Sequence, residues 1–278
     1  NFSQLSPRIN TNVQYQLKNG MLLWSFNFVN SNHGMDVINR AMIQVNSHMM
    51  EKGMPELKKS HDINTYLYYM GRFNRLSVSA IGQFRYNHHP VTDNYYFDKT
   101  NEKLVKTYSN DGNAQYYSAI LALQYKLSKF ANLSGDIRYN HAHVKTTWAK
   151  FNNNLTGNLG MNLFVGAFAF KPYLHFGKKS LDEASLVVSR TPIDYGMSCS
   201  YSKGNLYVEL QAISPFKKQE KRYWLDLPIY SYHKSIKDQT DSQYANIKIA
   251  YSLDFGRKTK KVDKDISKSI NSSLLRVK

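Results

Sequence analysis

The chain contains 278 residues with a mass of 32.2 kDa, a length that allows one or two ordinary domains. Aromatic residues make up 14% of the chain and the mean hydropathy is −0.54, a combination that suits strands with one apolar and one polar face. No run of about 18 or more apolar residues occurs, which excludes a membrane-spanning helix, so a place in a membrane would require a closed β-barrel.

Apolar and polar residues alternate over stretches of about ten residues, the pattern of strands with one face in lipid and one in a polar lumen. In the first stretch Ile9, Val13 and Tyr15 share one face and Asn12 lies on the other, before a tight turn at 18–20. The later strands present these outward residues: Leu22, Trp24, Phe26, Phe28; Ile63, Leu67, Tyr69; Leu76, Val78, Ala80, Phe84, Tyr86; Tyr117, Ala119, Leu121, Leu123, Tyr125, Leu127; Leu133, Gly135, Ile137, Tyr139; Leu155, Leu159, Met161, Leu163, Val165; Ile193, Tyr195, Met197, Cys199, Tyr201; Leu206, Val208, Leu210; Ile247, Ile249, Tyr251, Leu253, Phe255.

The fourth predicted hairpin alternates poorly, with a turn at 170–172 and a return strand at 173–177. The last strand, at 246–255, alternates best. We count about eleven strands. The sequence therefore predicts an all-β fold, a transmembrane antiparallel up-and-down β-barrel.

Short turns alternate with longer connections along the whole chain. The longer connections are predicted at 33–59, 89–113, 146–154, 181–189 and 215–242. Because outer-membrane barrels have short periplasmic turns and longer extracellular loops, this alternation assigns sidedness and directs the last strand towards the periplasm. Bacterial single-chain barrels have an even number of strands, so an odd count implies at least one earlier strand before Asn1. A count that is off by one would instead give a self-contained barrel of ten or twelve strands.

Three stretches resemble the C-terminal part of TonB-dependent outer-membrane receptors of the Bacteroidetes type. SPRINTNVQYQLKNGMLLWSFNF at 6–28 resembles a paired-strand hairpin with a short periplasmic turn, and IAYSLDFGRK at 249–258 resembles the closing strand. EKGMPELKKS at 51–60 resembles a loop segment of the form Gly-Asn-Pro-x-Leu-Lys-Pro-Glu. Gly53, Pro55, Leu57 and Lys58 match this segment, whereas Met54 replaces its Asn and Lys59-Ser60 replaces its Pro-Glu.

The resemblance implies a 22-stranded transporter whose lumen is filled by an N-terminal plug. This sequence shows neither plug nor TonB box, so residues 1–256 would supply about half of the barrel wall, and contact with the TonB complex would depend on an absent N-terminal region. Alone, a half-barrel would leave two open edges in lipid. Residues 257–278 carry eight Lys or Arg and two Asp, and we expect a solvated basic periplasmic tail, with contact to headgroups or a periplasmic partner as the alternative.

The sequence does not predict catalysis, and we expect no cofactor or metal. It has no nucleophile elbow, His-Glu-x-x-His helix or Gly-rich phosphate loop, and the lumen-facing Asp136 and Glu209 have no nucleophile partner. His141 and His143 share a strand face and His88-His89 are adjacent, but neither pair has an identifiable third ligand. Cys199 is a lone cysteine, so it cannot form an internal disulfide.

Loop aromatics are the better candidates for contact with an external ligand, because loops carry recognition on a rigid scaffold. These candidates are Tyr95, Tyr96, Phe97, Tyr223 and Trp224, with packing between loops as the alternative role. Aromatics near strand ends are expected to form the interfacial girdles, namely Trp24, Tyr86, Tyr125, Tyr139 and Tyr251.

The resemblance implies an integral protein of the bacterial outer membrane that imports a nutrient of the siderophore, glycan or peptide type. Outer-membrane lipid and lipopolysaccharide would be its partners, together with a surface lipoprotein. The net charge of +17 also suits nucleic acid, but no zinc-finger spacing, helix-turn-helix or basic helix occurs, and we expect no such binding. The alternative is a complete small barrel that acts in surface adhesion or as a structural protein.

Overall fold

The computed structural model describes residues 6–31, 33–216, 219–237 and 243–253. These residues form nineteen strands and one helical turn, α1 (Met35–Ile38). The strands are β1 (Arg8–Leu17), β2 (Gly20–Ser31), β3 (Met42–Asn46), β4 (Met49–Lys52), β5 (Ser60–Phe73), β6 (Leu76–His88), β7 (Thr92–Asp98), β8 (Lys103–Ser109), β9 (Asn113–Lys126), β10 (Ala131–Lys145), β11 (Ala149–Val165), β12 (Phe168–His175), β13 (Lys178–Leu181), β14 (Val188–Thr191), β15 (Asp194–Lys203), β16 (Leu206–Ile213), β17 (Lys221–Asp226), β18 (Ser231–Ile236) and β19 (Tyr244–Tyr251). The predicted tail at 257–278 and the end of the last predicted strand, 254–255, lie outside the described residues.

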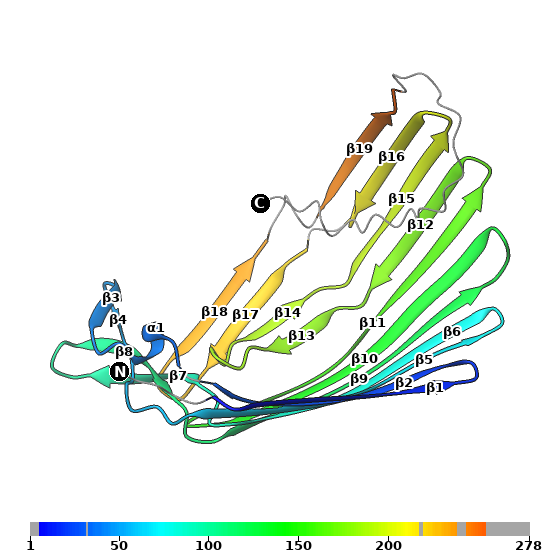
Figure 1. Cartoon of the computed structure of the whole chain (residues 1–278). Helices are drawn as coiled ribbons and strands as arrows, with labels where there is room; N and C mark the ends of the chain where they lie inside the picture. Colours follow the sequence, from blue (N-terminus) through cyan, green and yellow to red (C-terminus); the bar gives the residue numbers. More distant parts are fainter. Residues whose placement is uncertain (1–5, 32, 217–218, 238–242, 254–278) are drawn as a thin grey trace.

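Eleven strands form one large antiparallel sheet in the order β1-β2-β5-β6-β9-β10-β11-β12-β15-β16-β19. Each strand pairs with the sheet strand that precedes it in the chain, which is an up-and-down arrangement, and the sheet is strongly curved (Figure 1). Within the described part of the chain, β1 and β19 each have one neighbour in this sheet. The predicted all-β, antiparallel, eleven-stranded fold is confirmed. No helix in these residues is long and apolar enough to span a membrane.

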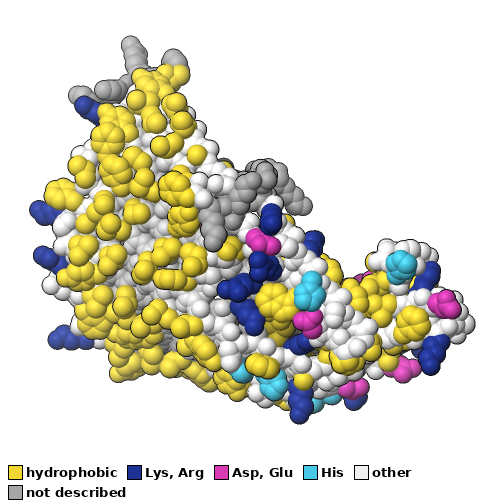
Figure 2. Space-filling model, turned by 180° about the vertical axis from the view of Figure 1, so that it is seen from behind, with side chains coloured by type: hydrophobic (Ala, Val, Ile, Leu, Met, Phe, Trp, Pro, Cys, Tyr) yellow, Lys and Arg dark blue, Asp and Glu magenta, His cyan; other side chains and the backbone are white. Residues whose placement is uncertain are grey.

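The registers place the predicted outward residues in continuous rows. Ala80 pairs with Leu121, and Leu121 with Ile137, so neighbours on one face are apolar from strand to strand. Many of these side chains are exposed, including Ile137, and Figure 2 shows an apolar surface that covers the sheet. The opposite, concave face carries polar residues such as Ser79 and Asp136. Since side chains alternate along a strand, the two faces follow directly from the period-two pattern.

Pro172 lies within a strand, so the predicted turn at 170–172 is wrong. The β11–β12 turn is formed by Gly166 and Ala167, and Gly166 has φ +60°, a conformation that favours glycine. Pro172 has no N–H for the ladder, and the β11–β12 register omits it while β15 still pairs alongside it. A proline that sits where one ladder is interrupted was therefore mistaken for a turn residue.

The predicted long loop at 146–154 is also wrong, because only residues 146–148 separate β10 from β11. The asparagines at 152–154 belong to β11, and two of them bond to a residue of β13. Asn152 donates to the carbonyl of Lys179, and Asn154 accepts from the N–H of the same residue at 2.7 Å. Their amides thereby extend backbone pairing from β11 to β13. The predicted loop at 181–189 is longer than expected, from 176 to 193, and contains β13 and β14.

Two four-stranded sheets are built from the long connections: β13-β14-β17-β18 and β3-β4-β8-β7. In Figure 1, β3, β4, β7, β8 and α1 gather at one end of the large sheet, opposite the short turns. The best-buried apolar cluster contains residues from different elements. Leu186 of the β13–β14 connection and Leu225 of β17 pack with Tyr95 of β7, Ala114 of β9 and Val144 of β10. The connections therefore pack as an ordered body on the ends of β9 and β10, which contribute Ala114 and Val144 to the shared core.

Candidate functional site

A pocket of about 820 Å³ opens between three connections at the long-loop end of the sheet. We call it the loop pocket. It is formed by the 32–59 connection, by the 89–112 connection and by Thr147 of the β10–β11 turn. The side chains that give it its chemistry are Arg40, Lys52, Lys58, Tyr96, Tyr108 and Asp111. The 51–60 segment that carries the family resemblance thus forms one wall of the pocket.

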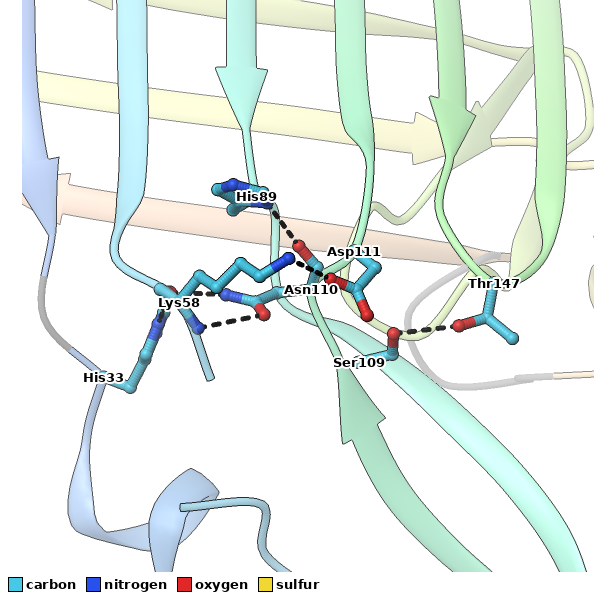
Figure 3. Close-up of polar contacts among 7 residues, drawn as sticks. All are labelled: His33, Lys58, His89, Ser109, Asn110, Asp111 and Thr147. Atoms are coloured by element: carbon cyan, nitrogen blue, oxygen red, sulfur yellow. Dashed lines mark hydrogen bonds and ion pairs between the residues drawn. The ribbon is translucent and has the colours of Figure 1, made fainter. Parts of the chain in front are cut away.

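Asn110 holds this wall in place. Its side-chain oxygen accepts a hydrogen bond from the Lys58 N–H at 3.2 Å, and its amide nitrogen donates to the Lys58 carbonyl. The side chain of Asn110 therefore pairs with Lys58 as a neighbouring strand would (Figure 3). His33 contacts the same carbonyl oxygen at 2.6 Å through Nε2. Asn110 is only 4% exposed, so its side of this polar clamp is protected from water, whereas Lys58 is exposed.

The chain reverses sharply on the far side of Asn110. His89 adopts φ +61°, donates its backbone N–H to the Gly112 carbonyl at 3.0 Å and contacts the Asn110 carbonyl through Nδ1 at 2.9 Å. Gly112 has φ +136°, and a Cβ there would lie 1.9 Å from the carbonyl oxygen of Lys145. A glycine is therefore required for the 89–112 connection to cross so close to the end of β10.

The third connection is fastened to the second by short side chains. The Thr147 hydroxyl donates to the Ser109 hydroxyl at 2.8 Å (Figure 3). The Trp148 indole N–H donates to the Asn94 side-chain oxygen at 2.9 Å. These bonds join β7, β8 and the β10–β11 turn into one support, so the pocket is held from all three sides.

Charges beside the pocket are organised around Lys106. Its ammonium lies 3.4 Å from Glu51 and 3.3 Å from Asp93, and it stands over the Tyr108 ring. The Tyr108 hydroxyl donates to Glu51 at 2.6 Å, and this bond together with Lys106 lowers the pKa of the Glu51 carboxyl. Burial raises the pKa of Asp93, and burial and the bond to Glu51 raise that of Tyr108. The half-buried Tyr108 thus remains a neutral donor.

Lys58 and Asp111 form an exposed ion pair at 2.8 Å across the mouth of the pocket (Figure 3). The ammonium lowers the pKa of the Asp111 carboxyl. Arg40 and Lys52 also line the pocket, and no ion pair involves either of them among the described residues. The pocket therefore offers two unpaired cations beside tyrosine rings, an arrangement that can hold an anionic or strongly polar group against an aromatic surface.

Comparison with known proteins gives one structural similarity to report. No protein-family model matches the chain, and no curated protein matches it. Among solved structures it is similar to a copper transporter, OprC, with 9% sequence identity and a TM-score of 0.48. The match covers 90% of this chain and 50% of the other, so the chain spans about half the length of that structure.

The loop aromatics predicted as ligand contacts are divided by the structure. Tyr96 lines the loop pocket, and Phe97 beside it is 58% exposed. Tyr95 is 8% exposed and packs against Tyr230 with ring centroids 5.0 Å apart, so it serves the core between the connections. Tyr223 lines a second pocket of about 530 Å³. The Trp224 ring is covered by the Lys179 ammonium at 5.7 Å.

Sequence reasoning missed Arg40, Lys52, Tyr108 and Asn110. The Asn-Asp-Gly run at 110–112 is a recognisable turn signal and could have drawn attention to this connection. Nothing local indicates that the side chain of Asn110 would clamp a segment 52 residues earlier in the chain.

The predicted histidine pairs lie apart from the loop pocket or at its edge. His141 contacts Asn153 at 2.5 Å, and its strand neighbour His143 shares its face. The rings of His88 and His89 lie 3.9 Å apart. Within the residues that the structure describes, no three His, Cys, Asp or Glu side chains come together as metal ligands would.

Several ion pairs lie on the concave face. Arg85 lies 2.6 Å from Asp62 on the neighbouring strand and 3.3 Å from Glu183, which belongs to the β13–β14 connection. This triad ties that connection to the inside of the sheet. Asp136 accepts from Asn158 and lies 3.6 Å from Arg138, and Glu209 accepts from Tyr207. The two carboxylates that were considered for catalysis thus have partners along the wall.

Proposed function

We propose that this chain forms part of the wall and the external loops of a TonB-dependent outer-membrane receptor that imports a nutrient. The observation that carries the proposal is one continuous eleven-stranded meander with an apolar outer face and a polar concave face. A soluble sheet would bury its apolar face against another layer, whereas lipid is the natural environment for an apolar face of this extent. This supports an integral place in the bacterial outer membrane.

Further strands are needed to complete such a wall. In an antiparallel meander the first and eleventh strands run in the same direction, so pairing β1 with β19 would be parallel, unlike every other pair in the sheet. An additional set with an odd number of strands restores antiparallel pairing at both edges. This parity supports a larger even-stranded barrel, such as the 22 strands that the family resemblance implies. The additional strands would also pair the backbone groups of the two sheet edges, which lipid would otherwise leave without hydrogen-bond partners.

Ligand recognition is proposed for the loop pocket. It lies at the end that carries all the long connections, which is the extracellular end if the short turns are periplasmic. Its unpaired cations, Arg40 and Lys52, together with Tyr96, suit a nutrient that carries an anionic or strongly polar group. Coupling to the TonB complex would use a region outside this sequence, and a surface lipoprotein could cover the pocket from above.

Growth of the natural bacterium tests the proposal. The gene is deleted and growth is followed on defined media in which one nutrient is scarce: iron supplied as a chelate, carbon supplied as a glycan, or nitrogen supplied as peptides. Loss of growth on one medium, restored by the natural gene, is expected. The variant Lys52→Gln with Tyr96→Ala should restore it poorly, whereas Lys99→Gln, outside the pocket, should restore it fully. Unchanged growth on all media with lost surface attachment would instead favour the adhesion alternative.

A further inference from the structure

The five short turns of the large sheet carry a one-sided charge. Within two residues of these turns stand Lys18, Arg72, Arg75, Lys126, Lys129 and Lys203, and not one Asp or Glu. The long connections at the other end carry charges of both signs, for example Glu51 and Asp111 beside Lys52 and Lys58. The short-turn end therefore differs from the long-loop end in having basic side chains with no acidic neighbours in the turns.

Four of the basic residues belong to or adjoin the turns themselves: Lys18, Arg75, Lys129 and Lys203. All four are exposed, and no ion pair involves them in the described part of the chain. In Figure 2 basic side chains stand along the edge of the molecule next to the apolar surface. We call this row of turns the basic rim.

The basic rim is a rigid edge because each short turn is bonded to the next. The Asn19 carbonyl accepts from the Arg72 N–H at 2.8 Å, and the Arg75 carbonyl accepts from the Lys126 N–H at 2.8 Å. The same pattern continues with the carbonyls of residues 130, 167 and 205. Since neighbouring turns are two strands apart, they lie at intervals of roughly 10 Å, and the β11–β12 turn, which carries no charge, leaves roughly 20 Å between Lys129 and Lys203.

Exposed phenylalanines accompany the cations. Phe73 adjoins the turn of Arg75, and Phe130 follows Lys129. Phe168, which is also exposed, begins β12 after the β11–β12 turn, the one short turn without a charge. Phe168 packs on Tyr201 of the apolar face, with ring centroids 4.9 Å apart. Aromatic rings beside long basic side chains are suited to the boundary between acyl chains and headgroups, where the ring enters the apolar side and the cation reaches the phosphate.

We propose that the basic rim binds the headgroups of anionic phospholipids in the leaflet that surrounds the short turns. This rests on the proposed function, because it requires the apolar face to lie in a bilayer. The occupant is a phospholipid rather than a soluble anion because the cations are spread along an edge and flanked by apolar side chains, instead of converging on a pocket. Each cation meets a separate headgroup phosphate, so the rim recognises a charged layer and not one molecule.

The test uses the full natural chain in a neutral detergent, titrated with phosphatidylglycerol or with phosphatidylcholine. At low salt we expect phosphatidylglycerol to bind at least about tenfold more tightly. The preference should disappear at about 1 M NaCl, where screening acts over about 3 Å. It should also be lost in the quadruple variant Lys18→Gln, Arg75→Gln, Lys129→Gln and Lys203→Gln.

A matched quadruple variant controls for loss of positive charge. It removes four exposed lysines at the long-loop end, Lys59→Gln, Lys99→Gln, Lys145→Gln and Lys221→Gln, and should keep the preference. Equal binding of both lipids, equal loss in both quadruple variants, or a preference for lipid A phosphates alone would overturn the proposal.

Quenching of Trp24 separates this proposal from the one on which it rests. Trp24 is exposed on the apolar face, with its indole N–H donated to Thr65 at 3.0 Å. Brominated phospholipid should quench a part of the tryptophan emission that is missing in Trp24→Phe. If that quenching is absent, the membrane location itself fails. If quenching is present and the headgroup preference is absent, only the basic rim proposal fails.

Discussion

Replacing Asn110 with alanine is expected to release the 51–60 wall of the loop pocket. The side chain makes two hydrogen bonds to the backbone of Lys58, so alanine leaves both the N–H and the carbonyl of Lys58 without that partner. An unsatisfied buried polar group costs about 1 to 3 kcal/mol, and Lys58 is exposed enough for water to replace part of the loss. We therefore expect the free energy of local opening to fall by roughly 2 kcal/mol.

Hydrogen exchange measured by mass spectrometry reports this opening directly. A change of roughly 2 kcal/mol corresponds to about thirtyfold faster exchange of amides in peptides that span 51–60. Peptides from β9 and β10 should exchange at unchanged rates, because their ladders do not involve the clamp. Asn101→Ala is the matched control, since Asn101 donates to Asp98 in the exposed β7–β8 turn. If exchange at 51–60 rises by less than about threefold in Asn110→Ala, the clamp does not hold the wall and the reasoning is refuted.

Three further changes have defined outcomes. Gly112→Ala places a Cβ against the Lys145 carbonyl oxygen at an unfavourable φ. In gel electrophoresis of samples heated to increasing temperatures, the folded band of the variant should be lost at a lower temperature than that of the natural protein. An unchanged temperature would contradict the required close approach. Tyr108→Phe removes the hydrogen bond that lowers the pKa of Glu51, so the natural protein should resist proteolysis of the 32–59 connection better than the variant while Glu51 is ionised. This difference should be complete above about pH 4.5 and should vanish as the pH falls through the lowered pKa of Glu51. Leu225→Ala removes a side chain that is 2% exposed and should destabilise the packed connections by about 2 to 5 kcal/mol, with faster hydrogen exchange in β14 and β17 but not in β1 or β2.

The sequence by itself determined the large sheet. A period of two is a local property, so the apolar members of each strand could be assigned to one face before any strand was paired. The tight turn predicted at 18–20 is found between β1 and β2 because a short polar segment that ends in glycine interrupts that period. Together these signals predicted eleven strands and the direction in which each face points.

The loop pocket and the body of packed connections were decided only by the tertiary structure. Tyr95 and Tyr96 are neighbours of the same type, yet one is buried in a core and the other lines the pocket, because different segments pack on the two sides of β7. Asn152 and Asn154 fall within the connection predicted at 146–154, but they lie in β11 and their partner, Lys179, is supplied by β13. Asn110 gains its role from Lys58, which is distant in the chain. Such partners are brought together by folding, so a local pattern contains no record of them, whereas the alternation that built the sheet is written within each strand.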